Sequence, residues 1–197
     1  MKIGLFGGSF NPPHYGHFEL ASAFRTEGHL DVLWVLVSPE PPHKAEDVLA
    51  SYQHRLAMAS LLFDHTQGIE INRIEEDLPA PHFTYQTIQA LKDQYPQTTF
   101  FLCLGEDSLE HFMEWKQPES IISDVELLIA RRPGVDANLE KLPAPWLSRI
   151  HFINAPLIPI SSSDIRKRVL AQNPIEDLLP SEIADYIKRH HLYGSAE

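Results

Sequence analysis

Gly7-Gly8-Ser9-Phe10-Asn11-Pro12-Pro13-His14-Tyr15-Gly16-His17 follows directly on the apolar run Ile3-Gly4-Leu5-Phe6. This order predicts a buried strand, then a glycine turn, then a helix that begins with two histidines three residues apart. Glycines let a backbone approach a ligand closely, and a helix N-terminus attracts anions, most often phosphate. Two imidazoles aimed at one place can donate hydrogen bonds to phosphate oxygens. The stretch therefore indicates a phosphate-binding loop.

Other interpretations of this loop are weaker. The P-loop pattern Gly-x-x-x-x-Gly-Lys-Ser/Thr and the dinucleotide pattern Gly-x-Gly-x-x-Gly are both absent. A metal site built on His14 and His17 lacks nearby carboxylate or thiolate ligands. An ordinary glycine turn with surface histidines stays open for this stretch taken alone.

The composition limits the function classes. The 197 residues suit one domain with a sizeable core, and the formal net charge of −11 argues against general binding to nucleic acid or to a membrane surface. An anionic substrate must therefore meet a local cluster of basic residues. Cys103 is the only cysteine, which fits a reducing compartment, so we expect a cytoplasmic protein. The first residues have no signal-peptide layout, and no apolar run is long enough to span a bilayer.

Short apolar runs alternate with helical patterns along the chain. The expected strands are residues 2–6, 32–37, 69–72, 99–104, 126–130 and 150–153. The expected helices are residues 16–27, 52–64, 85–94, 109–115, 164–171 and 182–190. This alternation predicts an α/β fold: a Rossmann-like, doubly wound parallel sheet of about six strands with helices on both faces. We expect a single domain over residues 1–197, with a C-terminal helical part over about residues 160–197.

The ends of the expected elements carry further signals. Ser51 and Ser163 are expected to cap the N-termini of two helices, and Gly28 the C-terminus of another. The proline-rich segments 38–44 and 131–145 are expected to be long loops, which in compact domains are often functional.

A second stretch suited to phosphate is Ile160-Ser161-Ser162-Ser163-Asp164-Ile165-Arg166. Serines at a helix start offer hydroxyl and N–H groups, and an arginine in the first turn can form two bonds to phosphate oxygens. A capped amphipathic helix with solvated basic residues stays open for this stretch alone.

The two stretches resemble the (His/Thr)-x-Gly-His and Ile-Ser-Ser-Thr-x-Ile-Arg signatures of the nucleotidyltransferase superfamily. Within it, the chain most resembles the bacterial nicotinate-nucleotide adenylyltransferases, and the resemblance covers nearly the whole chain. The further segments that carry it are Pro41-Pro42-His43-Lys44, Leu104-Gly105-Glu106-Asp107-Ser108-Leu109 with Trp115, Arg132-Pro133-Gly134, and Leu178-Leu179-Pro180 with His191-Leu192-Tyr193. The resemblance implies the nucleotidyltransferase type of α/β fold.

Two positions depart from the family pattern. His82-Phe83-Thr84 stands where the family usually has Ser-Tyr-Thr, and Glu106 replaces the usual alanine. Both fall where the resemblance places the pyridine nucleotide, so the preference for nicotinate over nicotinamide stays open here.

The resemblance implies transfer of AMP from ATP to the 5′-phosphate of nicotinate mononucleotide in NAD biosynthesis, giving nicotinate adenine dinucleotide and pyrophosphate. The attacking phosphate is already an anion near neutral pH, so the reaction needs alignment and charge neutralisation rather than an enzymatic nucleophile. We expect Mg²⁺ to arrive on the ATP phosphates, with no metal site formed by the protein itself. The partners would be the two nucleotides, with no nucleic acid or membrane, and the protein a monomer or homodimer.

The alternatives to this reaction differ in the acceptor or in catalysis. They are an adenylyltransferase acting on nicotinamide mononucleotide or phosphopantetheine, a cytidylyltransferase, and a non-catalytic nucleotide-binding module. Lys44, Trp115 and the turn that begins at Arg132 favour the pyridine nucleotide as acceptor. His14, His17 and Arg166 favour catalysis.

The resemblance also assigns roles to residues. The catalytic residues would be His14, His17 and Arg166. The ATP-binding residues would be Gly8, Ser9, Phe10, His17, Gly105, Asp107, Ile160, Ser161, Ser162 and Arg166. The mononucleotide-binding residues would be Asn11, Lys44, Thr84, Leu104, Trp115 and Arg132, with Lys44 on the phosphate and Trp115 stacked on the pyridine ring.

Overall fold

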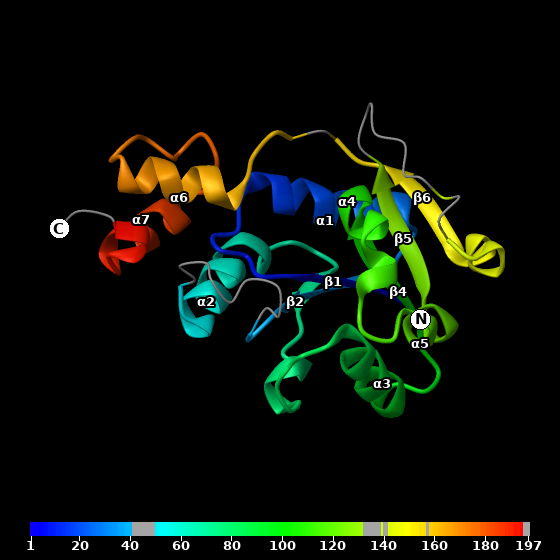
Figure 1. Cartoon of the computed structure of the whole chain (residues 1–197). Helices are drawn as coiled ribbons and strands as arrows, with labels where there is room; N and C mark the ends of the chain where they lie inside the picture. The colour runs from blue at the N-terminus through cyan, green and yellow to red at the C-terminus, as the bar shows by residue number, and fades with distance from the viewer. Residues whose placement is uncertain (41–49, 132–138, 140–141, 157, 195–197) are drawn as a thin grey trace.

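A computed structural model describes residues 1–40, 50–131, 139, 142–156 and 158–194 (Figure 1). Its six strands form one all-parallel sheet in the order β3-β2-β1-β4-β5-β6. The strands are β1 (Lys2–Gly8), β2 (Val32–Val37), β3 (Ile69–Ile71), β4 (Thr99–Gly105), β5 (Glu126–Arg131) and β6 (Ile150–Asn154). The α-helices are α1 (Tyr15–Glu27), α2 (Tyr52–Phe63), α3 (Thr84–Gln94), α4 (Glu106–Glu110), α5 (Pro118–Asp124), α6 (Ser162–Leu170) and α7 (Ser181–Arg189). Short 3-10 helices are η1 (Ile74–Asp77), η2 (Phe112–Glu114), η4 (Ala144–Arg149) and η5 (Leu192–Gly194).

Both faces of the sheet are buried, as the unbroken apolar runs predict. Along β2, Leu33 and Val35 join the core cluster that includes residues of α1, α2, α6 and α7. Trp34 and Leu36 alternate with them and join the cluster that includes residues of α3, α4 and α5. The fold is therefore the doubly wound parallel α/β arrangement that the sequence predicts.

The C-terminal helices pack on the core beside the start of the chain. Ile165 of α6 and Ile183 of α7 belong to the same buried cluster as Phe10 and Phe24. Figure 1 shows α6 and α7 beyond the N-terminal end of α1. The segment that carries the second phosphate motif is thereby placed next to the first.

The expected strands agree with the structure to within about two residues at each end. The expected helix over residues 109–115 is wrong, because α4 begins directly after β4 and ends at Glu110, before the separate η2. Helix α5 was not predicted. It has seven residues, with a proline at its first position and a left-handed Gln117 (φ 55°) before it. Helices this short show too little periodicity to be recognised.

The expected caps are partly right. Ser51 Oγ accepts a hydrogen bond from the His54 N–H at 3.4 Å, and Gly28 caps the C-terminus of α1. Ser163 is not a cap: Ser161 caps α6, and its Oγ accepts from the Asp164 N–H at 3.1 Å. The proposed loops fall mostly on residues 41–49 and 132–138, which lie outside the described residues. None of the described helices is long and apolar enough to cross a bilayer.

Arg55 of α2 ties together the loops at the carboxyl end of the sheet. Its side chain is only 1% exposed, and its guanidinium donates hydrogen bonds to four carbonyl oxygens. These are Ser9 O at 2.8 Å, Ser38 O at 2.7 Å, Pro39 O at 2.9 Å and Ala50 O at 3.0 Å. The segments after β1, after β2 and before α2 therefore share one donor group.

We expect Arg55→Met to lower the free energy of unfolding by at least about 3 kcal/mol, because four carbonyl oxygens lose their buried donor. Arg73→Met is the matched control, since Arg73 is exposed and pairs only at the surface, with Glu76. It should cost far less, because an exposed ion pair contributes little to stability. Urea unfolding of the two variants measures the difference, and equal losses would contradict the role given to Arg55.

Candidate active site

The loop after β1 is fixed by the aromatic ring of Phe10. Phe10 is 1% exposed, has φ of 48°, and packs edge-on against Phe6 and Phe63 with ring centroids 5.7 and 6.1 Å away. A Cβ at Gly8 would lie 3.0 Å from the Phe10 ring. A glycine at position 8 therefore lets the loop fold back over its own aromatic side chain.

The two histidines of the loop lie against each other at the start of α1. Their ring centroids are 3.8 Å apart, and the His14 N–H donates to His17 Nδ1 at 3.3 Å. Because Nδ1 of His17 accepts, the proton of its neutral ring is on Nε2, which is then the donor. A Cβ at Gly16 would lie 3.0 Å from the His14 ring, so this pairing also depends on a glycine.

His14 is buried and uncharged at neutral pH. It is 6% exposed, and burial lowers its pKa from 6.5 to about 4. Its Nδ1 atom is buried without a hydrogen-bond partner in the described part of the chain. His14 can therefore serve a phosphate as a neutral hydrogen-bond donor rather than as a cation.

The second motif is hydrogen-bonded to the first across about 150 residues of sequence. Ser162 Oγ donates to Pro12 O at 2.8 Å, and Arg166 donates to Asn11 O at 2.9 Å. Arg166 also donates to Ser163 Oγ at 3.3 Å. Its cation is thus held at the N-terminal turn of α6, beside the loop that carries the histidines.

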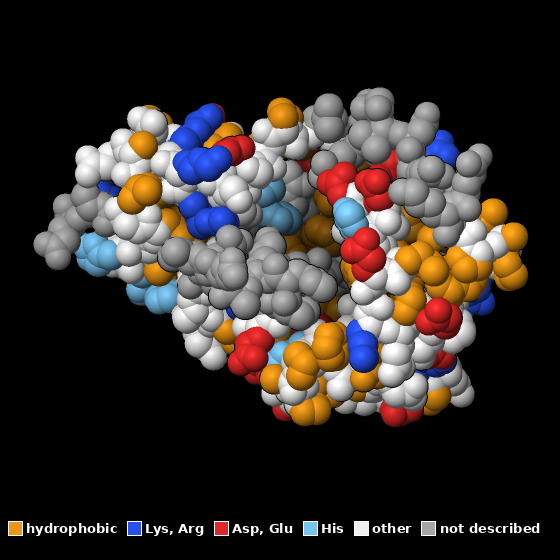
Figure 2. Space-filling view, viewed as in Figure 1, with side chains coloured by type: hydrophobic (Ala, Val, Ile, Leu, Met, Phe, Trp, Pro, Cys, Tyr) orange, Lys and Arg blue, Asp and Glu red, His pale blue; other side chains and the backbone are white. Residues whose placement is uncertain are grey.

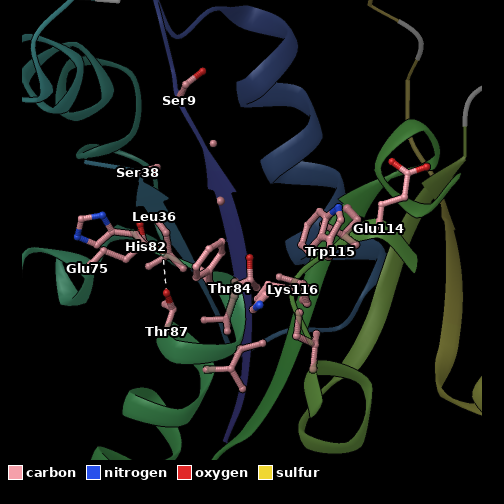
Figure 3. A pocket seen from close by; sticks show the side chains of 18 residues that line it. Ser9, Leu36, Ser38, Glu75, His82, Thr84, Thr87, Glu114, Trp115 and Lys116 are labelled. Carbon is pink, nitrogen blue, oxygen red and sulfur yellow. Dashed lines mark hydrogen bonds between the residues drawn. The ribbon is translucent and has the colours of Figure 1, made fainter. Parts of the chain in front are cut away.

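A pocket of about 380 Å³ opens beside this loop, at the carboxyl ends of β1, β2 and β4 (Figure 3). Of the residues predicted from the sequence, Gly8, Ser9, Thr84, Leu104 and Trp115 line it. The other lining residues are Leu5, Gly7, Leu36, Ser38, Glu75, His82, Phe83, Thr87, Ile88, Leu102, Glu114, Lys116 and Ile121. Most of the wall is apolar and aromatic, which suits a flat ring.

Charge is divided between the two sides of the site. In Figure 2, Lys and Arg side chains gather over α6, and Asp and Glu side chains gather over α4 and η2 across a hollow. The basic side is Arg166, Lys167 and Arg168, and the acidic side includes Asp107, Glu110 and Glu114. In a chain of net charge −11, α6 is therefore a local basic cluster, in which Lys167 pairs with Asp164 at 3.4 Å and Arg168 with Asp177 at 2.9 Å.

The remaining predicted residues lie around this centre or beyond the described chain. Gly105 ends β4, and Asp107 is exposed in the first turn of α4. Ile160 and Ser161 line a second pocket, of about 350 Å³, together with Lys167 and Arg168. Lys44 and Arg132 lie outside the described residues.

Asn11 does not line the large pocket. Its side chain is buried, and Oδ1 accepts from the Ala50 N–H at 3.0 Å and from the Tyr193 O–H at 2.8 Å. Burial raises the pKa of Tyr193, while the nearby charges of Arg166 and Arg55 lower it. Asn11 thus joins the loop to α2 and to the C-terminal segment.

Sequence reasoning missed several residues of the site. Arg55 gave no signal, because an arginine in a helical pattern resembles an ordinary surface residue. Tyr193 stood in a segment that carries the family resemblance, but nothing in the sequence indicated its bond to Asn11. Glu75 and Thr87 line the pocket and are hydrogen-bonded to each other at 2.9 Å. His82 and Phe83, which also line it, were noticed only as departures from the family pattern. The described residues contain no group of three or more His, Cys, Asp or Glu side chains that could hold a metal ion.

Comparison with known proteins identifies the class. The family model described as cytidylyltransferase-like matches residues 5–168, so the chain belongs to the cytidylyltransferase-like nucleotidyltransferases. A protein of Salinibacter ruber described as a probable nicotinate-nucleotide adenylyltransferase is 37% identical over 194 residues, covering 98% of each chain. The nicotinate-nucleotide adenylyltransferase of Bacillus subtilis is 29% identical over 98% of this chain and 99% of its own. Within the class, the chain belongs to the nicotinate-nucleotide adenylyltransferases.

A solved structure has the same fold. The Plasmodium falciparum nicotinic acid mononucleotide adenylyltransferase complexed with NaAD superposes with a TM-score of 0.79. The sequences are 23% identical, and the match covers 99% of this chain and 98% of the other.

Burial of neutral His14 predicts a pH-dependent stability. His14 takes up a proton near pH 6.5 in the unfolded chain but only near pH 4 in the folded chain. The free energy of unfolding therefore falls as the pH is lowered from 6.5 to about 4. At pH 5 the loss from this residue is about 2 kcal/mol relative to pH 7. Urea unfolding at both pH values should show a smaller loss for His14→Gln than for the parent. If His14→Gln lost as much stability between pH 7 and pH 5 as the parent, the lowered pKa of His14 would be contradicted.

Proposed function

We propose that this chain transfers AMP from ATP to the 5′-phosphate of nicotinate mononucleotide, forming nicotinate adenine dinucleotide and pyrophosphate in NAD biosynthesis. The observation that carries the proposal is the pair of hydrogen bonds from Ser162 and Arg166 to the backbone at Pro12 and Asn11. These bonds unite two phosphate-binding segments beside an apolar pocket large enough for a pyridine ring.

The chemistry follows from this arrangement. A phosphate oxygen attacks the α-phosphorus of ATP, and pyrophosphate leaves from the opposite side. Two anions must be aligned and the charge that develops on the phosphoryl oxygens must be stabilised. Neutral His14 and the Nε2–H of His17 supply hydrogen bonds there, and Arg166 offsets charge on the departing pyrophosphate.

We assign the two nucleotides to two sides of the site. ATP takes the loop and α6 side, with Gly8, Ser9, Phe10, Gly105, Asp107, Ile160, Ser161 and Ser162 as the binding residues besides the catalytic ones. The mononucleotide takes the large pocket, with Trp115 stacked on the pyridine ring and Thr84 near its substituent. Leu104 belongs to this side, and we assign Lys44 to the mononucleotide phosphate and Arg132 to the same nucleotide. Asn11, expected to bind the mononucleotide, does not line the pocket, so we give it the role of holding the loop.

We further propose that Mg²⁺ enters with ATP on its phosphate oxygens, where it offsets their charge. Residues 1–197 act as a single nucleotidyltransferase domain, because α6 and α7 share a buried core with β1 and α1. Cytoplasmic location and a monomeric or dimeric state stay predictions from the sequence.

The direct test is a pyrophosphate-release assay with ATP and a panel of acceptors. We expect release with nicotinate mononucleotide, and little with phosphopantetheine or when CTP replaces ATP. Release with phosphopantetheine or CTP alone would favour a related transferase. Nucleotide binding without release for any acceptor would indicate a non-catalytic module.

His17→Ala should lower kcat by on the order of a hundredfold, because a donor to the transition state is lost. The variant should remain folded because His17 is only partly buried, although its ring packs against His14 and Phe10. His65→Ala, at an exposed position after α2, is the matched control and should keep the parent kcat. Steady-state pyrophosphate release measures both, and near-normal turnover of His17→Ala would remove the central role of this residue.

A further inference from the structure

The turn after α7 has an unusual backbone. Helix α7 ends at Arg189, and η5 (Leu192–Gly194) packs against both α6 and α7. Within η5, Tyr193 has φ of 59° and ψ of 23°, a left-handed conformation that residues other than glycine seldom adopt. Its side chain packs against the buried cluster that contains Phe10. Such a conformation persists only where the surroundings hold it, so the turn points to a task for the Tyr193 side chain.

The hydrogen bond between Tyr193 and Asn11 has one possible direction. Asn11 Oδ1 accepts from the Ala50 N–H at 3.0 Å, and this partner can only donate, so the atom is the amide oxygen. The Tyr193 hydroxyl lies 2.8 Å from the same oxygen and therefore donates to it. Asn11 is only 1% exposed, so the bond is made inside the protein. The C-terminal turn thus holds a buried side chain of the loop after β1.

Asn11 links this bond to the cation of the second motif. Its backbone carbonyl accepts from Arg166 at 2.9 Å. The charges of Arg166 and Arg55 lower the pKa of the Tyr193 hydroxyl, whereas burial has the larger effect and raises it. The hydroxyl therefore keeps its proton for Asn11, and it lies within electrostatic reach of the guanidinium that Asn11 holds.

These contacts lie on the side of the site that we assign to ATP. Neither Asn11 nor Tyr193 lines the large pocket that we assign to the mononucleotide. Ser162 donates to the carbonyl of Pro12, the neighbour of Asn11, so a shift of the loop would move Ser162 and Arg166 together. A change at Tyr193 should therefore affect the triphosphate and leave the mononucleotide pocket unaltered.

We propose that Tyr193 is a positioning residue for the triphosphate of ATP. Its hydroxyl holds Asn11, and through Asn11 it holds the loop and Arg166 in the arrangement that binds the β- and γ-phosphates. In this role the tyrosine acts through Asn11 rather than on the nucleotide itself. The proposal rests on the adenylyl transfer proposed above and adds a residue from the C-terminal turn to the ATP side of the site.

Tyr193→Phe tests the proposal because it keeps the ring and removes only the hydroxyl. The KM for ATP should rise by about tenfold, the effect of one ordinary hydrogen bond, while the KM for nicotinate mononucleotide stays within about twofold of the parent. Pyrophosphate release, with each nucleotide varied in turn, measures both constants.

A purely structural role gives a different result. Partial unfolding inactivates a fraction of the molecules, so it lowers kcat and leaves both KM values unchanged. That result overturns the proposal. Two KM values that rise equally, or two that stay at the parent values, also overturn it.

Tyr186→Phe makes the same chemical change elsewhere in the C-terminal segment. The Tyr186 hydroxyl is bonded to His54 of α2 at 2.9 Å, away from the loop. Its removal should leave both KM values within about twofold of the parent. A rise in the KM for ATP equal to that of Tyr193→Phe would reflect general loosening of the segment, and it overturns the proposal.

A double-mutant cycle tests whether the effect passes through Asn11. Asn11→Ala should raise the KM for ATP by itself, because the loop loses the same bond. Adding Tyr193→Phe to Asn11→Ala should then raise it by less than about twofold more. If the two increases multiply in full, Tyr193 acts independently of Asn11 and the proposal is overturned.

Binding of ATP without an acceptor separates this proposal from the proposed function. Calorimetric titration with ATP and Mg²⁺ should give a Kd about tenfold higher for Tyr193→Phe than for the parent. The Kd for AMP should change by less than about twofold, because AMP lacks the β- and γ-phosphates. Equal weakening of ATP and AMP, or an unchanged Kd for ATP, overturns the proposal. A parent that binds ATP but releases no pyrophosphate with any acceptor contradicts the proposed function instead.

Discussion

One buried cation holds the carboxyl end of the sheet together. The described hydrogen-bond partners of the Arg55 guanidinium are four carbonyl oxygens, which belong to three separate segments of chain. Carbonyl dipoles satisfy its N–H groups without cancelling its charge. The loop that begins at Ser9, which we propose binds phosphate, therefore rests on a positive charge. In a protein of net charge −11, this placement favours anionic ligands at that loop without exposing another basic side chain.

The site combines two kinds of donor with different tasks. His14 and His17 are tied to each other through the His14 backbone, so their rings are positioned before a substrate arrives. Such preorganisation matters where charge moves during a reaction, because the donors need no reorganisation. Arg166 is a permanent cation fixed by its bond to the Asn11 carbonyl. In the proposed reaction, the loop would thus supply directed neutral donors, and Arg166 of α6 would supply charge.

Much of the fold could be predicted from the sequence because it depends on local patterns. Unbroken apolar runs located the strands, and the order of strands and helices gave the doubly wound sheet. The division of residues 106–124 into α4, η2 and α5 was not predictable from the spacing of apolar residues. It depends on the left-handed conformation of Gln117 and on tertiary packing. The cap at Ser161 was missed because three serines in a row offer equivalent candidates.

The motifs predicted a phosphate-binding centre and the structure brings them together, whereas the residues that support them were not visible in the sequence. His14, His17, Ser162 and Arg166 stand in recognisable patterns, and the fold brings those patterns together. Arg55 works through backbone carbonyls, which no residue pattern specifies.

The hydrogen bond between Asn11 and Tyr193 joins positions 182 residues apart in the sequence. During synthesis on a ribosome, the loop after β1 emerges early, and Tyr193 follows only after every strand of the sheet has been made. The core of the sheet can therefore form before the loop receives its last support. A nascent chain would acquire its fold first and its finished phosphate site afterwards, so the two events are separated in time by the direction of translation.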